Sequence, residues 1–323
     1  MHAFIRALGL ALLTLLWAGN PAWAQEYPAR PIRIIIPSNA GSLPDVLARS
    51  LSVRLQEQSN WATFIDNRPG GNFIIGNAAA AQAAPDGYSI LFALSTMTQL
   101  PATQKNLPYD LMRDLVPVTR VGAAPSMIAV HPSVPARNLK DLITWSKANP
   151  GKLNYGTGGA GSTTHLTGEY IRLEAGLDWT NVPYRDSTRV MPDLLNGLIL
   201  ATITVPGNLL QHFNSGKLAP IAVIGSRRSL VIPDIPTTTD AGFNIPIGDA
   251  WFGIMVPARV PGEIVASLHR AVVAALQSGE LRQQYQKVGV LPFTESPDEF
   301  RKILENELAV WPRIIRDAKI KID

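Results

Sequence analysis

Cysteine is absent from all 323 residues of the sequence. Its absence excludes disulfides, thiolate nucleophiles, iron–sulfur clusters and thiolate zinc sites. After residue 24 only four histidines remain, and no two of them stand at the H-x-x-x-H spacing typical of a metal site: His131, His165, His212 and His269. We therefore expect no bound metal and no cofactor.

Long apolar runs are also missing, except at the N-terminus. Arg6 precedes an apolar segment over residues 7–17, and Ala22-Trp23-Ala24 has the A-x-A form of a cleavage site. The run is short for a membrane-spanning helix, so the pattern predicts a secretory signal peptide over residues 1–24, cleaved after Ala24. A short membrane anchor is the alternative. The expected location of the mature chain is the periplasm.

No strong charge bias is present. The formal net charge is +4, and the basic residues are scattered without a run of five or more. This distribution argues against a nucleic-acid partner. A chain of this length buries a core large enough to fold without disulfides, and its length suits two domains.

One segment is rich in glycine and hydroxyl side chains. It runs from Asn154 to His165 and holds four glycines followed by Ser162, Thr163 and Thr164, ahead of a predicted helix. Glycine lets a backbone approach a ligand closely, and a hydroxyl residue caps the N-terminus of a helix. The free N–H groups at such a terminus favour an anion. The segment therefore predicts an anion site built from backbone and hydroxyl groups.

Strand and helix patterns alternate along the chain, which predicts mainly parallel α/β sheets. Turns rich in glycine and serine follow two of the strands, at the edge where open α/β sheets bind ligands. The expected strands are 31–37, 64–66, 88–94, 127–130, 198–205, 219–224 and 251–256, with helices over 46–57, 77–84, 139–148, 191–195, 261–277, 279–288 and 297–316.

A series of short motifs covers the chain in order: Tyr27 to Arg33, Pro37 to Asp45, Asp66 to Gly71, Ala84 to Tyr88, Leu107 to Asp110, Pro150 to Tyr155, the glycine and threonine segment with His165 and Leu166, Val182 to Tyr184, Gly216 to Leu218, Pro233 to Thr237 and Trp251 to Gly253. With these motifs the chain resembles the Bug-type periplasmic solute-binding proteins of tripartite tricarboxylate transporters.

The resemblance implies a two-domain periplasmic-binding-protein fold of the Venus-flytrap, type II-like kind, with two crossover segments. Domain 1 would comprise residues 25–124 plus 230–323, and domain 2 residues 125–229. The expected function is a receptor, not an enzyme, that captures a small carboxylate between the domains. Its expected partners are the membrane permease subunits of the transporter, and we expect a monomer.

The resemblance also implies where the ligand lies. One carboxylate would be held largely by backbone amides of two loops, Ser38–Asp45 and Thr157–His165. The candidate ligand-binding residues are Ser38, Asn39, Ala40, Gly41, Ser42, Asp45, Ser95, Thr96, Thr157, Gly158, Gly159, Ser162, Thr163, Thr164, His165, Arg185, Asp249 and Trp251.

Three of these positions depart from the family pattern. Asn39 replaces an apolar wall, which indicates either loop drift or a changed ligand preference. Arg185 is either a surface charge or a fork onto a second carboxylate. Asp249 could recognise an amine or cap a strand end. In Trp251-Phe252, strand alternation directs the two rings to opposite faces, one of which could form the wall of the ligand site.

Two other functions fit parts of the sequence less well. An exported hydrolase would use Ser162 and His165 with an acid such as Asp45, but no G-x-S-x-G elbow is present, and Ser162 fits a helix cap better while His165 fits a brace for the loop. A phosphate site would need a Gly-Lys-Ser/Thr sequence, and the only lysine nearby, Lys152, lies before the loop.

Overall fold

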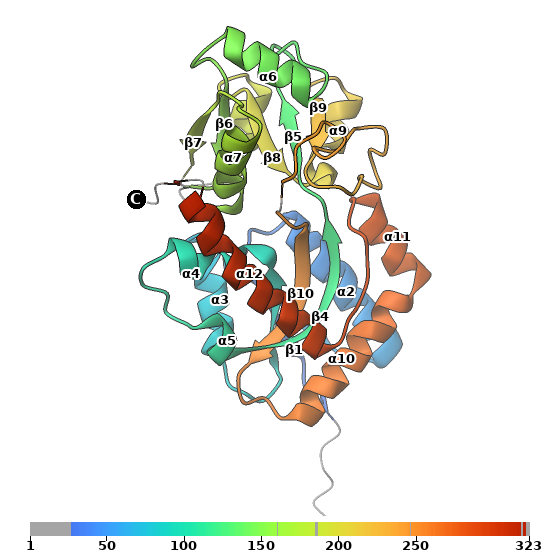
Figure 1. Ribbon diagram of the computed structural model, residues 1–323. Helices are drawn as coiled ribbons and strands as arrows, with labels where there is room; N and C mark the ends of the chain where they lie inside the picture. The colour runs from blue at the N-terminus through green and yellow to red at the C-terminus, as the bar shows by residue number, and fades with distance from the viewer. Residues whose placement is uncertain (1–26, 160, 185–186, 246, 318, 321–323) are drawn as a thin grey trace, which may run out of the picture.

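The computed structural model describes residues 27–159, 161–184, 187–245, 247–317 and 319–320. The predicted signal peptide and Arg185 lie outside these ranges. The chain forms two lobes, one above the other in Figure 1. In the described part, no helix has both the length and the apolar character needed to cross a membrane.

The lower lobe is built on a five-stranded sheet of order β2-β1-β3-β10-β4. Its strands are β1 (Ile32–Ile36), β2 (Thr63–Asn67), β3 (Ser89–Leu94), β4 (Leu115–Ala124) and β10 (Ala250–Pro257). Helices α2 (Leu43–Ser59), α10 (Gly262–Gln277) and α11 (Gly279–Lys287) contribute to the core on one face. The other face is covered by α3 (Ile74–Ala81), α4 (Leu100–Thr103), α5 (Leu111–Asp114) and α12 (Pro297–Asp317), and the short 3₁₀ turn η1 (Ser95–Thr98) follows β3.

The upper lobe repeats this arrangement with the order β7-β6-β8-β5-β9. Its strands are β5 (Met127–Val130), β6 (Asn154–Thr157), β7 (Thr180–Pro183), β8 (Ala201–Thr204) and β9 (Ala219–Val223). Its helical segments are α6 (Leu139–Ala148), α7 (Thr163–Glu174), η2 (Ser187–Arg189), α8 (Val190–Leu195), η3 (Pro206–Asn208) and α9 (Leu210–Asn214).

Both sheets are mixed, so the expectation of mainly parallel sheets needs a correction. The fourth strand of each order, β10 below and β5 above, is antiparallel to its neighbours. Each of these strands is the first one after the chain crosses from one lobe to the other. Because it enters its lobe from the facing side, it runs away from the other lobe while its neighbours run toward it.

Several elements also differ from the sequence prediction, among them α3, which spans Ile74–Ala81 where the prediction was 77–84. Strand β4 was not predicted, although it is one of the longest strands; Pro117 and Gly122 interrupt its pattern. Helix α2 begins at Leu43 instead of Val46, with Pro44 in its first turn. Proline is tolerated there because the first helical N–H groups have no partner within the helix.

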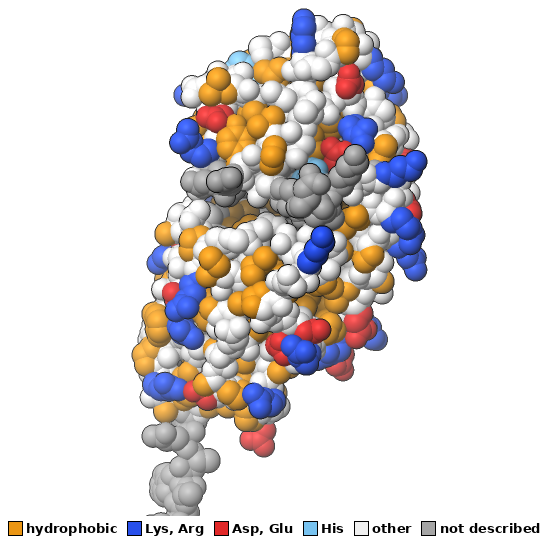
Figure 2. Space-filling view, turned by 90° about the vertical axis from the view of Figure 1, so that its left-hand side faces the viewer, with side chains coloured by type: hydrophobic (Ala, Val, Ile, Leu, Met, Phe, Trp, Pro, Cys, Tyr) orange, Lys and Arg blue, Asp and Glu red, His pale blue; other side chains and the backbone are white. Residues whose placement is uncertain are grey.

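The chain crosses between the lobes after β4 and again before β10. A third connection is α12, which packs on the lower lobe through Phe300 and Leu304 but reaches the upper core with Trp311 and Ile314. The two-domain α/β architecture is confirmed. That the two domains divide after residue 124 and between residues 229 and 230 stays a prediction. On the face shown in Figure 2, basic and acidic side chains are interspersed.

Candidate functional site

The carboxyl ends of eight strands face the region between the lobes, which we call the interlobe edge. Strands β1, β2 and β3 are parallel, and β4 runs with them because both β3 and β4 are antiparallel to β10. Since β4 ends where the chain leaves for the upper lobe, all four end there. The same reasoning places the ends of β6, β7, β8 and β9 opposite them.

The first candidate loop, Ser38–Asp45, leaves the end of β1 and enters α2. Asn39, Ala40 and Gly41 are exposed at its tip. The N-terminus of α2 has no side-chain cap, because the hydroxyl of Ser42 pairs with that of Ser38 at 2.9 Å. Its first-turn N–H groups are therefore left for another acceptor.

Asp45 is buried and braces this loop. Its carboxylate accepts hydrogen bonds from the Gly41 N–H at 2.9 Å, from Arg49 Nε at 2.9 Å and from Asn67 Nδ2 at 3.0 Å. Burial would raise the pKa of Asp45, but the hydrogen bonds from Arg49, Gly41 and Asn67 outweigh it and lower the pKa. The described contacts of Asp45 thus fix the loop's shape; whether it also touches a ligand stays a prediction.

The second segment is the turn Ser95–Thr98 at the end of β3. Ser95 and Thr96 are partly buried, and Thr98 is fully buried. The Oγ1 of Thr96 is inaccessible to solvent and has no hydrogen-bond partner. Nearby in sequence, the Nε2 of Gln99 is in the same state. Gln99 was not among the predicted residues, since a lone glutamine gives no pattern.

The third segment follows β6 and enters α7. Thr157 is buried and donates to Asn181 Oδ1 at 2.8 Å. Gly159 and Gly161 adopt φ of +107° and +72°, a conformation that favours glycine. Gly158 and Gly159 are partly exposed. A Cβ on Gly161 would lie 2.8 Å from the Cβ of Thr103 in α4, so the lobes touch at this point.

Ser162 and His165 have the structural roles that the sequence predicted. Ser162 caps α7, accepting from the His165 N–H at 3.3 Å and donating to the Gly159 carbonyl at 2.7 Å. The Nδ1 of His165 accepts from the Gly161 N–H at 3.1 Å and braces the loop. Burial lowers the pKa of His165, against the opposing effect of Glu169, so the ring is neutral at pH 7.

The two threonines at the start of α7 complete this loop. Thr164 Oγ1 lies 3.1 Å from the Ser162 hydroxyl. Thr163 Oγ1 is inaccessible to solvent and has no hydrogen-bond partner. A buried hydroxyl without a hydrogen-bond partner destabilises the folded protein, and a ligand that bonds to the hydroxyl would remove this cost. Among the described residues, the hydroxyls in this state are those of Thr96 in the lower lobe and Thr163 in the upper lobe, and each lies beyond the carboxyl end of its strand.

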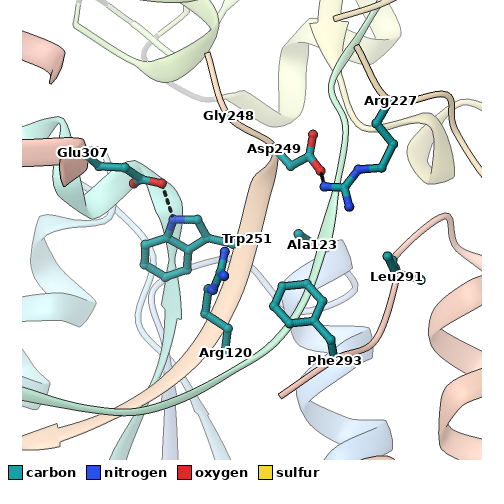
Figure 3. Close-up of a pocket in the computed structure, with 9 residues that line it drawn as sticks. All are labelled: Arg120, Ala123, Arg227, Gly248, Asp249, Trp251, Leu291, Phe293 and Glu307. Atoms are coloured by element: carbon teal, nitrogen blue, oxygen red, sulfur yellow. Dashed lines mark hydrogen bonds and ion pairs between the residues drawn. The ribbon is translucent and has the colours of Figure 1, made fainter. Parts of the chain in front are cut away.

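Asp249 and Trp251 lie elsewhere. They line a pocket of about 430 Å³ beside the crossover strands, which we call the hinge pocket. Figure 3 shows that Asp249 faces Arg227, with which it forms an ion pair, and that the Trp251 indole points to Glu307. The remaining lining residues are Arg120, Ala123, Gly248, Leu291 and Phe293.

The alternation predicted for the two rings is confirmed, because they lie in cores on opposite faces of the sheet. Trp251 packs edge-on against Phe300 at 5.0 Å, and Phe252 lies beside Phe92 on the other face. The structure therefore separates the nominated residues into the interlobe segments and the hinge pocket. Arg185 is not among the described residues. Within the described ranges, no cluster of His, Asp and Glu has the makeup of a metal site.

A two-lobed α/β protein with matched sheets, two crossovers and loops facing each other belongs to the class of solute-binding proteins. Among these, the chain belongs to the tripartite tricarboxylate transporter receptor family, whose model matches residues 47–320. The family and the structural relatives are solute-binding proteins rather than enzymes, and the resemblance seen in the sequence is confirmed.

Individual relatives support this assignment. Protein BugT of Bordetella pertussis is 32% identical, over 100% of this chain and 99% of its own. A solved structure described as R. palustris Rpa4515 with adipate is 29% identical, covers 91% of this chain and 99% of that chain, and has a TM-score of 0.85. The periplasmic binding protein BugD is 26% identical, with 91% and 99% coverage and a TM-score of 0.84.

Proposed function

We propose that the chain is a periplasmic receptor that holds a small carboxylate at the interlobe edge. The observation that carries the proposal is the pair of buried, unpartnered hydroxyls, Thr96 in the lower lobe and Thr163 in the upper lobe. Thr163 is also the first residue of α7, where free N–H groups and the helix dipole favour an anion.

The ligand class follows from the chemistry of these groups. Hydroxyl and backbone N–H donors bind a carboxylate through charge-assisted hydrogen bonds, without burying a full opposite charge. The relative described with adipate supports the same class. The exposed tip at Asn39, together with Arg185, is our candidate for contacting the end of the ligand opposite this carboxylate and so determining specificity.

Other parts of the proposal concern the cell. We expect cleavage after Ala24 on export, a monomeric mature chain, and delivery of the ligand to the permease subunits of a tripartite transporter. Intact-mass measurement of the exported protein tests the cleavage site, and light scattering after size-exclusion chromatography tests the monomer.

Binding is tested with a thermal-shift and calorimetric series of mono-, di- and tricarboxylates. An acid that binds should raise the melting temperature further as its concentration increases, because the stabilisation grows with the logarithm of the ligand concentration above the Kd. Thr96→Val and Thr163→Val keep the side-chain shape and remove the hydroxyl. Each should weaken binding by roughly tenfold or more, because hydrogen bonds to charged groups contribute about 1.5–3 kcal/mol.

The matched control is Thr144→Val, on the exposed surface of α6 away from the interlobe edge. It should bind as the wild type does. Equal affinities of the three variants, or no response to any acid well above micromolar concentration, would reject the proposed site.

A further inference from the structure

A partly buried hydrogen-bond network joins α12 to the turn Ser95–Thr98 and to the crossover strand β10. Glu307 of α12 lies at its centre. One carboxyl oxygen accepts from Trp251 Nε1 at 2.8 Å, and the other lies 2.8 Å from Thr98 Oγ1. Figure 3 shows the first of these contacts, with Glu307 approaching the indole from the side of α12.

The Thr98 hydroxyl has two possible acceptors within hydrogen-bond distance but only one proton to donate. Its Oγ1 lies 2.8 Å from the Ser95 carbonyl, 2.8 Å from Glu307 and 3.2 Å from Trp311 Nε1. The carbonyl can only accept and the indole N–H can only donate. The hydroxyl accepts from Trp311, so its one proton remains for either Ser95 or Glu307.

The conflict disappears when Glu307 is a carboxylic acid. Its own proton then goes to Thr98 Oγ1, which accepts from Trp311 as well and donates its hydroxyl proton to the Ser95 carbonyl. With an ionised Glu307, the Ser95 carbonyl and the carboxylate would compete for the same proton. The protonated carboxyl therefore satisfies every contact of Thr98, a group that is almost fully buried.

We propose that Glu307 is a positioning residue, which carries a proton and donates it to Thr98 so that the turn Ser95–Thr98 stays closed beside the ligand. This inference rests on the proposed function, because Thr96 in that turn is one of the two candidate ligand hydroxyls. Through Trp251 the same carboxyl joins the turn to the crossover strand, and Thr98 itself accepts from Trp311 of the upper core.

The electrostatic surroundings agree with this assignment. Burial raises the pKa of Glu307 to about 7, against the lowering effects of Thr98, Trp251 and Arg120. Arg120 is itself paired with Glu295, at 2.5 Å, and Arg227 with Asp249, so each guanidinium already has a carboxylate partner other than Glu307. The turn itself has no titratable side chain.

Helix α7 also contacts α12. It carries His165, Glu169, Tyr170, Arg172 and Glu174, and Glu169 and Arg172 form an ion pair with each other at 2.9 Å. A pH effect on ligand binding therefore has to be separated from the titration of His165, which the variants below do.

The protonation is tested first without ligand, by infrared spectroscopy of the full mature chain. At pH 6 ordinary carboxyls are ionised, so a protonated carboxyl band should come from Glu307. The band should be lost at pH 8.5 and in Glu307→Gln, and should persist in the matched variant Glu305→Gln, which alters an exposed residue of the same helix. Thr98→Val should shift the band, and this variant decides the question if Glu307→Gln does not fold.

The positioning role is tested with adipate as the probe. Wild-type affinity should fall by about tenfold between pH 6 and 8.5, the equivalent of one hydrogen bond to a charged group. Glu307→Gln, whose amide can donate to Thr98 and accept from Trp251, should keep the high affinity at both pH values. Glu305→Gln should follow the wild type.

The outcomes are distinct. A wild-type chain without a protonated carboxyl band at pH 6, or a Glu307→Gln chain with the same pH dependence as the wild type, overturns the inference. A normal band in a chain that binds neither adipate nor any other acid of the series contradicts the proposed function while leaving the protonated Glu307 supported.

Discussion

At the scale of single residues, the chemistry of the loops could be predicted only where it is local. The cap at Ser162 and the brace at His165 follow from a hydroxyl and an imidazole three residues apart at a helix start. The contact between Asp45 and Asn67 could not be predicted, since Asp45 lies in α2 and Asn67 lies in β2, 22 residues further along the chain. The role of Glu307 could not be predicted either, because in the sequence it is one of several polar residues of a long amphipathic helix.

Asp45→Asn should destabilise the protein by about 1–3 kcal/mol at pH 7, because a buried carboxylate with three donors is lost. The pKa of Asp45 is lowered in the folded chain, so its contribution is full above the ordinary value of 3.8 and is lost as pH falls through the folded pKa. Urea unfolding at pH 7 and pH 3 measures this difference. The variant should lose less stability than the wild type on acidification.

The control for this measurement is Asp234→Asn, at an exposed position. Its unfolding curve should match that of the wild type at both pH values. An Asp45→Asn chain as stable as this control at pH 7 would show that the loop is held by other contacts.

At the scale of elements, strands with a continuous apolar sequence were predicted well, and those with interruptions were not. Residues 251–256 read as a strand because every position but Gly253 is apolar, and β10 contains them. β4 was not predicted, because Pro117 and Gly122 interrupt its apolar sequence. The pairing of β4 with β10 accommodates both residues and includes two register irregularities. Pairing of this kind depends on the tertiary fold and is not visible in the local sequence.

Helix α7 offers a test of packing at this scale. A Cβ on Gly168 would lie 2.3 Å from the ring of Tyr155, which is fully buried and stacks on Trp179 at 4.3 Å. Gly168→Ala should therefore cost about 1–3 kcal/mol in spite of the better helix propensity of alanine. Thermal unfolding followed by circular dichroism measures the loss.

Gly262→Ala is the matched change, since it also lies in a helix but has open space around its Cβ position. It should be neutral or slightly stabilising. If both variants melt at the same temperature, the close packing of α7 on Tyr155 is wrong.

At the scale of the whole molecule, the two lobes have equivalent strand orders, and the family resemblance predicted the two crossovers between them. The third connection, helix α12, was not predicted. Because α12 packs on the lower lobe but inserts Trp311 into the upper core, a movement of one lobe against the other would require its C-terminal half to bend or slide. Pro312 lies inside the helix at this point, where a proline weakens helical hydrogen bonding.

Trp311→Ala should remove about 3–5 kcal/mol of stability, as expected for a large buried ring. Val310→Ala, at an adjacent exposed position, should change it by less than about 1 kcal/mol. Urea unfolding of both variants, followed by circular dichroism, compares them. Equal effects would mean that α12 does not anchor the upper lobe.

We propose that a carboxylate binds at the interlobe edge between Thr96 and Thr163. The decisive measurement is a crystal structure of the mature chain with the acid that binds best. We expect a carboxylate within hydrogen-bond distance of the Thr163 hydroxyl and of N–H groups at the start of α7, with Thr96 contacting the ligand from the other lobe. An acid bound instead in the hinge pocket, against Arg120 and Arg227, would contradict it.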